Sequence, residues 1–263
     1  NSGSHVPSEH FASPGKNVFP VKPIFRLKQA HDFLLGEMPK RALKICVVGG
    51  GPAGVEIAGN LWRLLREGGG RGEVDLVAGK ALLPNLPEKV RQLVRASLEK
   101  RGIAIRGGVH VEGFGDGGVR LDDSDTLPFD AAFLAMGVSP SRIFSTSKLR
   151  TASDGGLLVD HFLRCVDHPE IFGGGDCIAF GEKPLDRVGV YAVRQGPILL
   201  LNLLSALEGK PLAPFKPQKK YLMILNLVER EGGFLSERPD RPSFYGEIPS
   251  VGGAWGIIVN LKI

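Results

Sequence analysis

Three glycines in this chain have the spacing of a phosphate-binding turn. Gly49, Gly51 and Gly54 form G-x-G-x-x-G within KICVVGGGPAGVEIAGNL, between an apolar run and a segment of helical periodicity. In such a turn the first glycine permits a tight bend, the second lets backbone approach a pyrophosphate, and the third lets the helix pack close to the strand. The helix that opens at Pro52 and Ala53 supplies free N–H groups, from Ala53 onward, and partial positive charge for the phosphates. Pro52 lacks an N–H, which costs nothing at the first position of a helix. The stretch therefore predicts a dinucleotide-binding turn, with a ligand-free βα turn as the alternative.

Three positions near this turn bear on which dinucleotide binds and how. An acidic residue that reads the ribose 2′-hydroxyl is expected about 20 residues on, after the second strand. Ala78 and Lys80 occupy that place in VDLVAGK, and Lys80 suits a 2′-phosphate or simply faces solvent. The choice between NADH and NADPH is therefore open. Glu56 either supports the helix start electrostatically or contacts the nicotinamide end of the dinucleotide.

The elements around the turn follow the order of an α/β domain. KICVV is a continuous apolar run, typical of a parallel strand buried on both faces. Apolar residues then recur at helical spacing from Val55 to Leu65. VDLV predicts a second strand, residues 86–102 a second helix, and IAI a third strand. This β-α-β-α-β order predicts a doubly wound parallel sheet.

The rest of the chain divides into segments of different character. Residues 109–135 alternate apolar and polar residues around Gly and Asp turns, which predicts a small antiparallel meander and then a strand, AAFLA, of the main sheet. GLLVD and EIFGGGD predict short strands, and VGVYAVRQGPILLLNLLSALEG a long helix. An early helix is expected to end near Gly36, and the tail from about Leu222 is strand-like. The predicted domains are a connector or remnant of another domain (1–39), a dinucleotide-binding domain (40–140), an incomplete α/β domain (141–214) and a tail (215–263).

The bulk composition excludes several classes of function. With 43% hydrophobic and 23% charged residues, the 263-residue chain has an ordinary globular composition. Its three cysteines are far apart and form no CxxC pair, so neither a redox dithiol nor a metal site is predicted. The net charge of +5 is spread out, and its one cluster, Lys216–Lys220, favours a solvated loop over a contact with anionic phospholipid or nucleic acid. There is no signal-peptide pattern, and the apolar run Ile198–Leu207 is too short for a bilayer, so a cytoplasmic location is expected.

Three further strings complete a pattern with the glycine turn. They are AFLAMGVSPS (132–141), HPEIFGGGDCIAF (168–180) and YAVRQGPILLLNL (191–203). In order and spacing the four motifs resemble the FAD/NAD(P)-dependent pyridine nucleotide–disulfide oxidoreductase superfamily over roughly residues 1–225. They look closest to type II NADH dehydrogenases and to the dehydrogenase-like module fused to some selenide, water dikinases. The resemblance implies an oxidoreductase that passes hydride from NAD(P)H to FAD, and electrons to a quinone or similar acceptor.

The same motifs imply the residues that hold these cofactors. Beyond the glycine turn and Glu56, these are Met136, Gly137, Gly175, Asp176, Ala192, Val193 and Gln195. The first two match the family's crossover beside the nicotinamide. Asp176 matches the aspartate that binds the ribityl chain of FAD, with a plain Asx turn as the alternative. The last three match the helix start that faces the flavin and the quinone pocket, with an ordinary amphipathic helix as the alternative.

The chain also departs from the family pattern. Family members carry an earlier G-x-G-x-x-G for the FAD pyrophosphate, and the residues before Lys44 contain none. The sequence therefore looks like a member without its N-terminal FAD half, and we expect little tightly bound FAD and exposed apolar faces that favour a homodimer. A non-catalytic dinucleotide-binding module is the alternative function. The tail GGAWGIIVNLKI resembles the start of a membrane-docking segment, which implies a peripheral location at the inner membrane.

Overall fold

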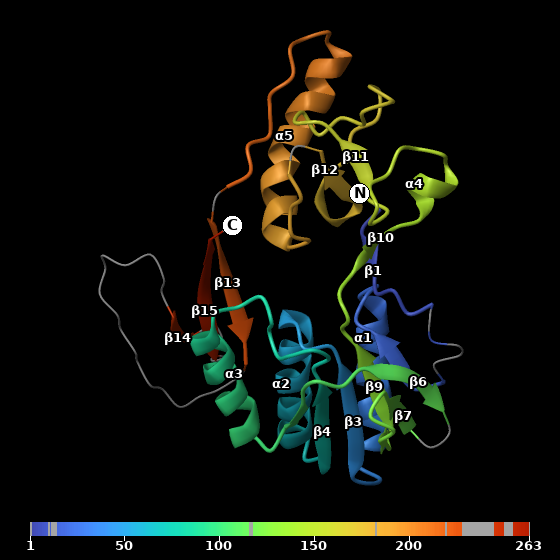
Figure 1. Ribbon diagram of the computed structural model, residues 1–263, viewed down its shortest axis with the longest axis vertical. Helices are drawn as coiled ribbons and strands as arrows, with labels where there is room; N and C mark the ends of the chain where they lie inside the picture. Colours follow the sequence, from blue (N-terminus) through green and yellow to red (C-terminus); the bar gives the residue numbers. More distant parts are fainter. Residues whose placement is uncertain are drawn as a thin grey trace. The chain divides into compact units, whose positions relative to one another are not determined.

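The structure is a computed structural model in which two compact units can be recognised (Figure 1). It describes residues 2–9, 11, 15–115, 118–181, 183–218, 220–227, 245–249 and 255–262. The first unit comprises Asn1–His5 and Val138–Lys219, and the second comprises Val6–Gly137 and Lys220–Ile263. Each unit is described by itself below.

A five-stranded parallel sheet forms the centre of the second unit. Its order is β2 (Val18–Pro20), β9 (Ala131–Leu134), β3 (Leu43–Val48), β4 (Gly72–Val77) and β5 (Ala104–Arg106). β3 and β4 are parallel neighbours in register from Leu43↔Gly72 to Val48↔Val77. β9 returns to pair with β3 on its other side. The predicted parallel sheet and the α/β fold class are confirmed.

Helices cover one face of this sheet. They are α1 (Phe25–Glu37), α2 (Pro52–Glu67) and α3 (Glu88–Lys100). Along β3, Ile45 and Val47 pack in the core with the helices, whereas Cys46 and Val48 face the other way. This alternation is the pleat of a strand that is buried on both faces.

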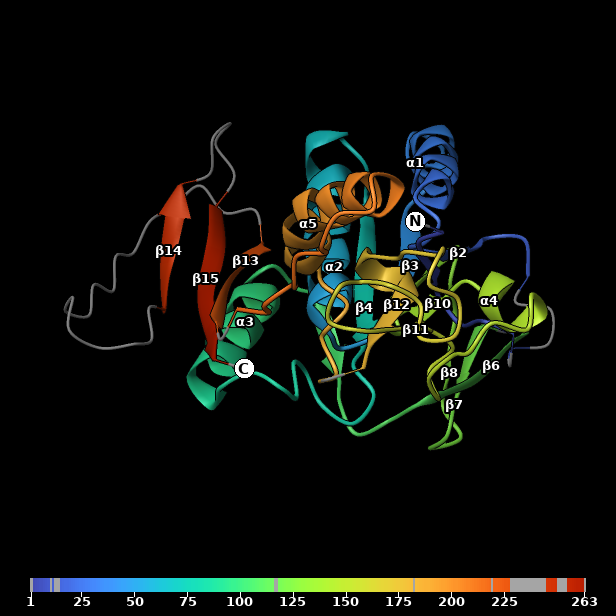
Figure 2. The ribbon, with the colours of Figure 1, turned by 90° about the horizontal axis from the view of Figure 1, so that it is seen from above.

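The other face carries the predicted antiparallel meander. It consists of β6 (Val111–Gly115), β7 (Gly118–Leu121) and β8 (Thr126–Leu127). Phe114 packs edge-on against Phe11, with ring centroids 5.1 Å apart. Figure 2 shows α1 and α2 on one side of the central strands and β6–β8 on the other. The second face of the sheet is therefore closed by strands rather than by helices.

The C-terminal tail adds a separate antiparallel sheet to the second unit. Its order is β13 (Lys220–Asn226), β15 (Trp255–Lys262) and β14 (Tyr245–Pro249). Leu225 and Leu227 are buried with the helical core, and the backbone of Leu227 lies beside Gly59 of α2. The tail is thus strand-like where it is described, and it packs on the helix that begins at the glycine turn. Its KPQKK segment lies partly outside the described residues.

The first unit is small and mixed. β1 (Ser4–His5) pairs with β10 (Ser139–Pro140), and β11 (Leu157–Val159) runs parallel to β12 (Ile178–Phe180). Two helices, α4 (Ile143–Thr146) and α5 (Gly189–Leu207), complete it. The strand predicted over EIFGGGD is wrong. Within this stretch Phe172 makes only an isolated β-bridge, and a 3₁₀ turn, η1 (Gly175–Cys177), follows. Gly175 has φ +80°, a left-handed conformation that a β-strand cannot contain, so the extended backbone ends before it.

Residues of the N-terminal segment 1–39 belong to both compact units. Ser4 and His5 belong to the first unit, whereas β2 adds an edge strand to the main sheet beside β9. Helix α1 buries Ala30 and Leu34 against that sheet, and it ends at the predicted place. A strand of three residues is too short to show alternation, so β2 left no periodic signal in the sequence.

Helix α5 contains the apolar run Ile198–Leu207. Its polar residues Asn202 and Ser205 are buried, while Leu200 and Leu207 are 60% and 86% exposed. By length and composition alone, α5 is the one helix among the described residues that could cross a membrane. The helix is longer than the apolar run on which the sequence-based expectation rested, and the run itself stays shorter than a bilayer span.

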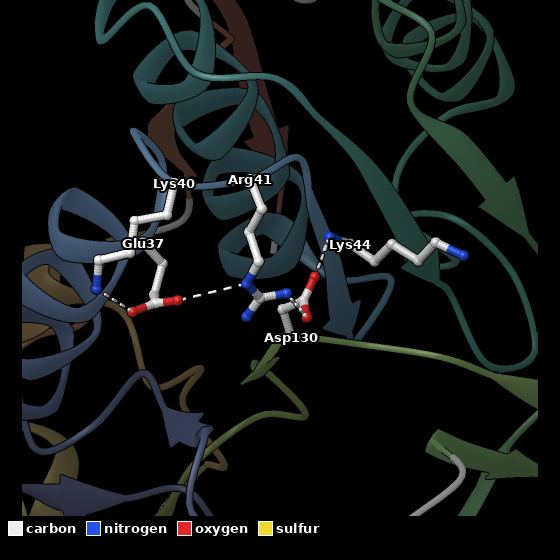
Figure 3. Close-up of polar contacts among 5 residues, drawn as sticks. All are labelled: Glu37, Lys40, Arg41, Lys44 and Asp130. Carbon is white, nitrogen blue, oxygen red and sulfur yellow. Dashed lines mark hydrogen bonds and ion pairs between the residues drawn. The ribbon is translucent and has the colours of Figure 1, made fainter.

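A polar network ties α1 to the first residues of β3. Asp130 accepts from the Lys44 N–H at 2.7 Å and from the Arg41 guanidinium (Figure 3). Arg41 also pairs with Glu37 at the end of α1, and Glu37 in turn pairs with Lys40 at 2.8 Å. Because Asp130 directly precedes β9, this network positions the first residues of the neighbouring strands β3 and β9.

The Asp130 carboxylate should make stability depend on pH. Burial opposes its ionisation, but the hydrogen bonds from Arg41 and Lys44 outweigh burial and lower the pKa of Asp130. A lowered pKa stabilises the folded state above the ordinary value of about 3.9, and this contribution is lost as the pH falls through the lowered pKa. We expect Asp130→Asn to lower the free energy of unfolding by about 1–2 kcal/mol at pH 7.

Urea unfolding followed by circular dichroism at pH 7 and in acid measures this effect. The difference in free energy of unfolding between wild type and Asp130→Asn should disappear in acid. Asp32→Asn is the matched control, because Asp32 is 55% exposed and pairs with Lys28 on the surface of α1. Equal losses in the two variants at pH 7 would contradict a structural role for Asp130.

Candidate functional site

The glycine turn joins β3 to α2 in the form that a dinucleotide-binding turn requires. Gly49 has φ +132°, and a Cβ atom at this position would lie 2.2 Å from the carbonyl oxygen of Ala135. Its N–H donates to the Val77 carbonyl at 2.8 Å, which links the turn to β4. The first glycine is therefore required by backbone conformation and by the close approach of β9.

The third glycine brings the helix against the turn. A Cβ atom at Gly54 would lie 1.8 Å from the carbonyl oxygen of Gly49, much closer than non-bonded atoms approach. No side chain larger than hydrogen fits without movement of backbone. Helix α2 thus begins directly over the end of β3.

The second glycine is different, because no described residue occupies the space beside it. No atom lies within 4 Å of a Cβ atom built at Gly51, whose backbone is extended at φ −79° and ψ 179°. Gly51 caps α2, Pro52 occupies the first helical position, and Ala53 is exposed. The first N–H groups of a helix have no acceptor inside the helix. This open, N–H-lined side of the turn fits a pyrophosphate.

A pocket of ≈ 380 Å³ opens beside the turn at the carboxyl ends of β3 and β4. It is lined by Phe11, Val48, Gly49, Val77, Gly79, Lys80, Val109, His110, Val111 and Met136. The structure thus brings together three of the predicted residues, Gly49, Lys80 and Met136. Ala78 is buried, and its carbonyl oxygen lies 2.4 Å from a Cβ atom built at Gly50, so its role is to pack the turn.

Glu56 has a partner that the sequence did not reveal. Its Oε1 accepts from the backbone N–H of Asn226, in β13, at 2.9 Å. Burial raises the pKa of Glu56, and the hydrogen bond from Asn226 opposes this rise. The contact lies on the second turn of α2, close to the glycine turn. Contact of Glu56 with a nicotinamide stays a prediction.

The predicted crossover follows β9 directly. Met136 packs against the core on the meander face, and Gly137 has φ +91°, a left-handed conformation that favours glycine. Both residues therefore sit at the carboxyl end of the strand beside β3. This is the edge at which ligands bind in open parallel sheets.

In the first unit, the predicted flavin motif lies in the 3₁₀ turn η1. Asp176 Oδ2 accepts from the Ser4 hydroxyl at 2.9 Å, and the Asp176 carbonyl accepts from Arg187 Nε at 2.9 Å. The Gly175 N–H donates to Gln195 Oε1 at 2.6 Å. Turn η1 is therefore held by the N-terminal strand, by Arg187 and by α5.

The predicted residues of α5 separate into two groups. Gln195 is 2% exposed, and its Oε1 accepts a hydrogen bond from the Gly175 N–H, so this buried side chain positions turn η1. Ala192 is half-buried and Val193 is 75% exposed, so neither anchors the turn. A second pocket, of ≈ 360 Å³, is lined partly by Gly175, Arg187 and Gln195.

Several residues of these sites were missed in the sequence. Asn226, Ser4 and Arg187 contact predicted residues from distant segments, and His110 lines the same pocket as Lys80. None of the four stands in a motif that marks it. No group of three or more potential metal ligands occurs among the described residues. All three cysteines are free and buried, which agrees with a packing role.

Comparison with known proteins identifies the family. Residues 2–196 match the family model "Pyridine nucleotide-disulphide oxidoreductase". The chain therefore belongs to this family, as its motifs predicted.

Relatives and a solved structure agree with this assignment. The chain is 25% identical over 205 residues to the mitochondrial internal alternative NAD(P)H-ubiquinone oxidoreductase A1 of Arabidopsis thaliana, covering 70% of this chain and 40% of the relative. It is 29% identical over 205 residues to the demethylphylloquinone reductase NdbB of Synechocystis, covering 74% of this chain and 49% of the relative. An FAD-dependent pyridine nucleotide-disulphide oxidoreductase from Desulfovibrio vulgaris shares the fold, with a TM-score of 0.63 and 22% identity, covering 100% of this chain and 70% of that one. The chain thus spans about half the length of the curated relatives it matches.

Proposed function

We propose that this chain binds NAD(P)H at the glycine turn and forms part of an FAD-dependent NAD(P)H oxidoreductase with a quinone-type acceptor. The observation that carries the proposal is the contrast among the three glycines. Protein atoms exclude a side chain at Gly49 and Gly54, whereas the space beside Gly51 is open. This is the arrangement expected when a ligand, and not the protein, requires the second glycine.

The chain's own residues then have defined parts. The Gly51–Gly54 turn would hold the pyrophosphate with backbone N–H groups, and Met136 and Gly137 would border the nicotinamide. In the first unit, Asp176 has a carboxylate suited to the hydroxyls of a ribityl chain, while Ser4 and Gln195 keep the turn in place. Bound FAD would supply the acceptor of hydride, and hydride transfer itself requires no general acid or base from the protein.

Support for a quinone as acceptor comes from the relatives. One is named as an NAD(P)H-ubiquinone oxidoreductase and another as a demethylphylloquinone reductase. Two finer assignments are part of the same proposal. We propose that the protein lies in the cytoplasm or peripherally at the inner membrane, with the C-terminal tail as the membrane contact, and that it forms a homodimer.

Direct titration of the purified chain tests the proposal. NADH and NADPH fluorescence reports dinucleotide binding, and absorbance near 450 nm after addition of FAD and gel filtration reports bound flavin. Oxidation of the bound dinucleotide by a soluble ubiquinone analogue in the presence of FAD then reports turnover. Binding without flavin or turnover favours the non-catalytic dinucleotide-binding module. A folded chain that binds neither dinucleotide overturns the proposal.

A further inference from the structure

We infer that the pocket at the carboxyl end of β4 recognises the 2′-phosphate of NADPH, and that Lys80 and His110 select NADPH over NADH. The inference rests on the proposed dinucleotide-binding function. It goes further by naming the dinucleotide and the residues that choose it. The sequence left this choice open.

The position of the pocket fits the adenosine ribose. A dinucleotide whose pyrophosphate lies on the glycine turn places this ribose beside the residues that follow the second strand. Here the second strand is β4, which pairs with β3 up to Val77↔Val48, and Gly79 and Lys80 follow it into the pocket lining. Gly79 has φ +62°, a left-handed conformation that turns the chain at this point.

The residue that would read a 2′-hydroxyl is absent from this lining. NADH-binding sites of this fold place a carboxylate after the second strand, where it accepts from the 2′-hydroxyl and repels a 2′-phosphate. None of the ten lining residues is acidic. The nearest acid along β4 is Asp75, which is only 24% exposed and is bonded to Arg106 at 3.3 Å. The lining therefore carries no charge that would oppose a phosphate.

Lys80 supplies a positive charge at the same place. Its side chain is exposed, and among the described residues no carboxylate pairs with it. A lysine ammonium acts as a point charge toward phosphate and needs no fixed geometry. A cation without an internal partner keeps its full attraction for an anionic ligand.

His110 lies next to the same turn. A Cβ atom built at Gly79 would be 3.7 Å from Cδ2 and 3.8 Å from Nε2 of His110. The opposite ring nitrogen, Nδ1, is 3.1 Å from Asp122 Oδ2, while Asp122 Oδ1 accepts from the His110 N–H at 2.9 Å. Asp122 thus orients the ring and is itself outside the pocket lining. In its protonated form, His110 donates to a phosphate from Nε2.

The remaining lining of the pocket is apolar. Apart from Lys80, His110 and two glycines, the walls are apolar: Phe11, Val48, Val77, Val109, Val111 and Met136. Such walls suit the apolar parts of a bound dinucleotide, while Lys80 and His110 supply the polar contacts.

Binding measurements on four proteins test this inference. NADPH and NADH are titrated into wild type, Lys80→Ala, Lys80→Glu and Lys44→Ala. Lys44 is the matched control because its exposed side chain carries the same charge and lies near the amino end of β3. In the hydrogen bond to Asp130, Lys44 uses its backbone N–H and not its side chain. We expect wild type to bind NADPH at least about tenfold more tightly than NADH, which is the scale of one charge-assisted phosphate contact.

The variants should separate the two dinucleotides. Lys80→Ala should bring the preference for NADPH to within about threefold by weakening NADPH alone, and Lys80→Glu should reverse it. Lys44→Ala should change neither affinity, and added salt should weaken NADPH binding more than NADH binding. If NADH binds as tightly as NADPH and Lys80→Ala alters neither, the inference is overturned while dinucleotide binding stands. If folded wild type binds neither, both the inference and the proposed function fail.

Discussion

Valine in place of Gly51 is expected to lower the affinity for both NADH and NADPH at least tenfold while the chain stays folded. A tenfold loss corresponds to about 1.4 kcal/mol of binding free energy. The fold should tolerate valine because no atom of the described part of the chain lies within 4 Å of the new Cβ and the backbone angles of Gly51 are extended. An extended conformation is also the one that a residue before proline prefers. The branched side chain would instead occupy the space needed by the pyrophosphate.

Fluorescence titration with each dinucleotide measures the loss, and circular dichroism with a thermal melt establishes that the variant is folded. Gly36→Val is the matched control, since Gly36 is exposed in α1 and also has no atom within 4 Å of a built Cβ. The control should bind both dinucleotides as wild type does. Unchanged affinity in a folded Gly51→Val protein would remove the glycine turn as the binding site.

The glycine turn and the strands around it could be predicted because their signals are local. Residue type and spacing within a dozen positions specify the bend at Gly49, the close approach at Gly54 and the apolar strands on either side. The same was true of α1 and of the meander, whose glycines and aspartates mark the turns. What the sequence could not reveal about this region was β2, whose three residues show no period.

Long-range contacts at the sites were beyond sequence reasoning. Glu56 meets Asn226 across 170 positions, and Ser4 meets Asp176 across 172. Each contact uses a backbone N–H or a hydroxyl, which nearly every segment offers, so no residue type marks the partner in advance. The misassigned strand at EIFGGGD has a related cause. Apolar residues before the glycines suggest extension, but the left-handed conformation of Gly175 ends it and forms the turn that presents Asp176.

The contact between Glu56 and β13 also gives the tail a structural part in the dinucleotide-binding unit. Leu225 and Leu227 are buried against the helices, and the Asn226 N–H between them reaches Glu56. Helix α2 is therefore held on two sides, by the sheet beneath it and by β13. Because the free N–H groups that would hold phosphate belong to the start of this helix, its position decides the shape of the turn.

Alanine in place of Gly54 is expected to lower the free energy of unfolding by at least about 3 kcal/mol, at the upper end of the cost of overpacking a protein interior. The added Cβ would lie 1.8 Å from the carbonyl oxygen of Gly49, which is backbone and cannot rotate away. Two fixed segments, the end of β3 and the start of α2, would have to separate. Alanine gains at most about 1 kcal/mol over glycine from helix propensity, so the clash dominates.

Gly59→Ala is the matched control on the same helix. There the nearest atom to the added Cβ is the Leu227 carbonyl oxygen at 3.6 Å, which is an ordinary van der Waals contact. The higher helix propensity of alanine should therefore leave the free energy of unfolding unchanged or slightly higher. Urea unfolding followed by circular dichroism compares the two variants with wild type. Where Gly54→Ala is too unstable for a full curve, limited proteolysis at equal protein concentration should show it cleaved faster than Gly59→Ala. Equal stability of the two variants would mean that α2 does not begin against Gly49, and the geometry from which the binding site was derived would be wrong.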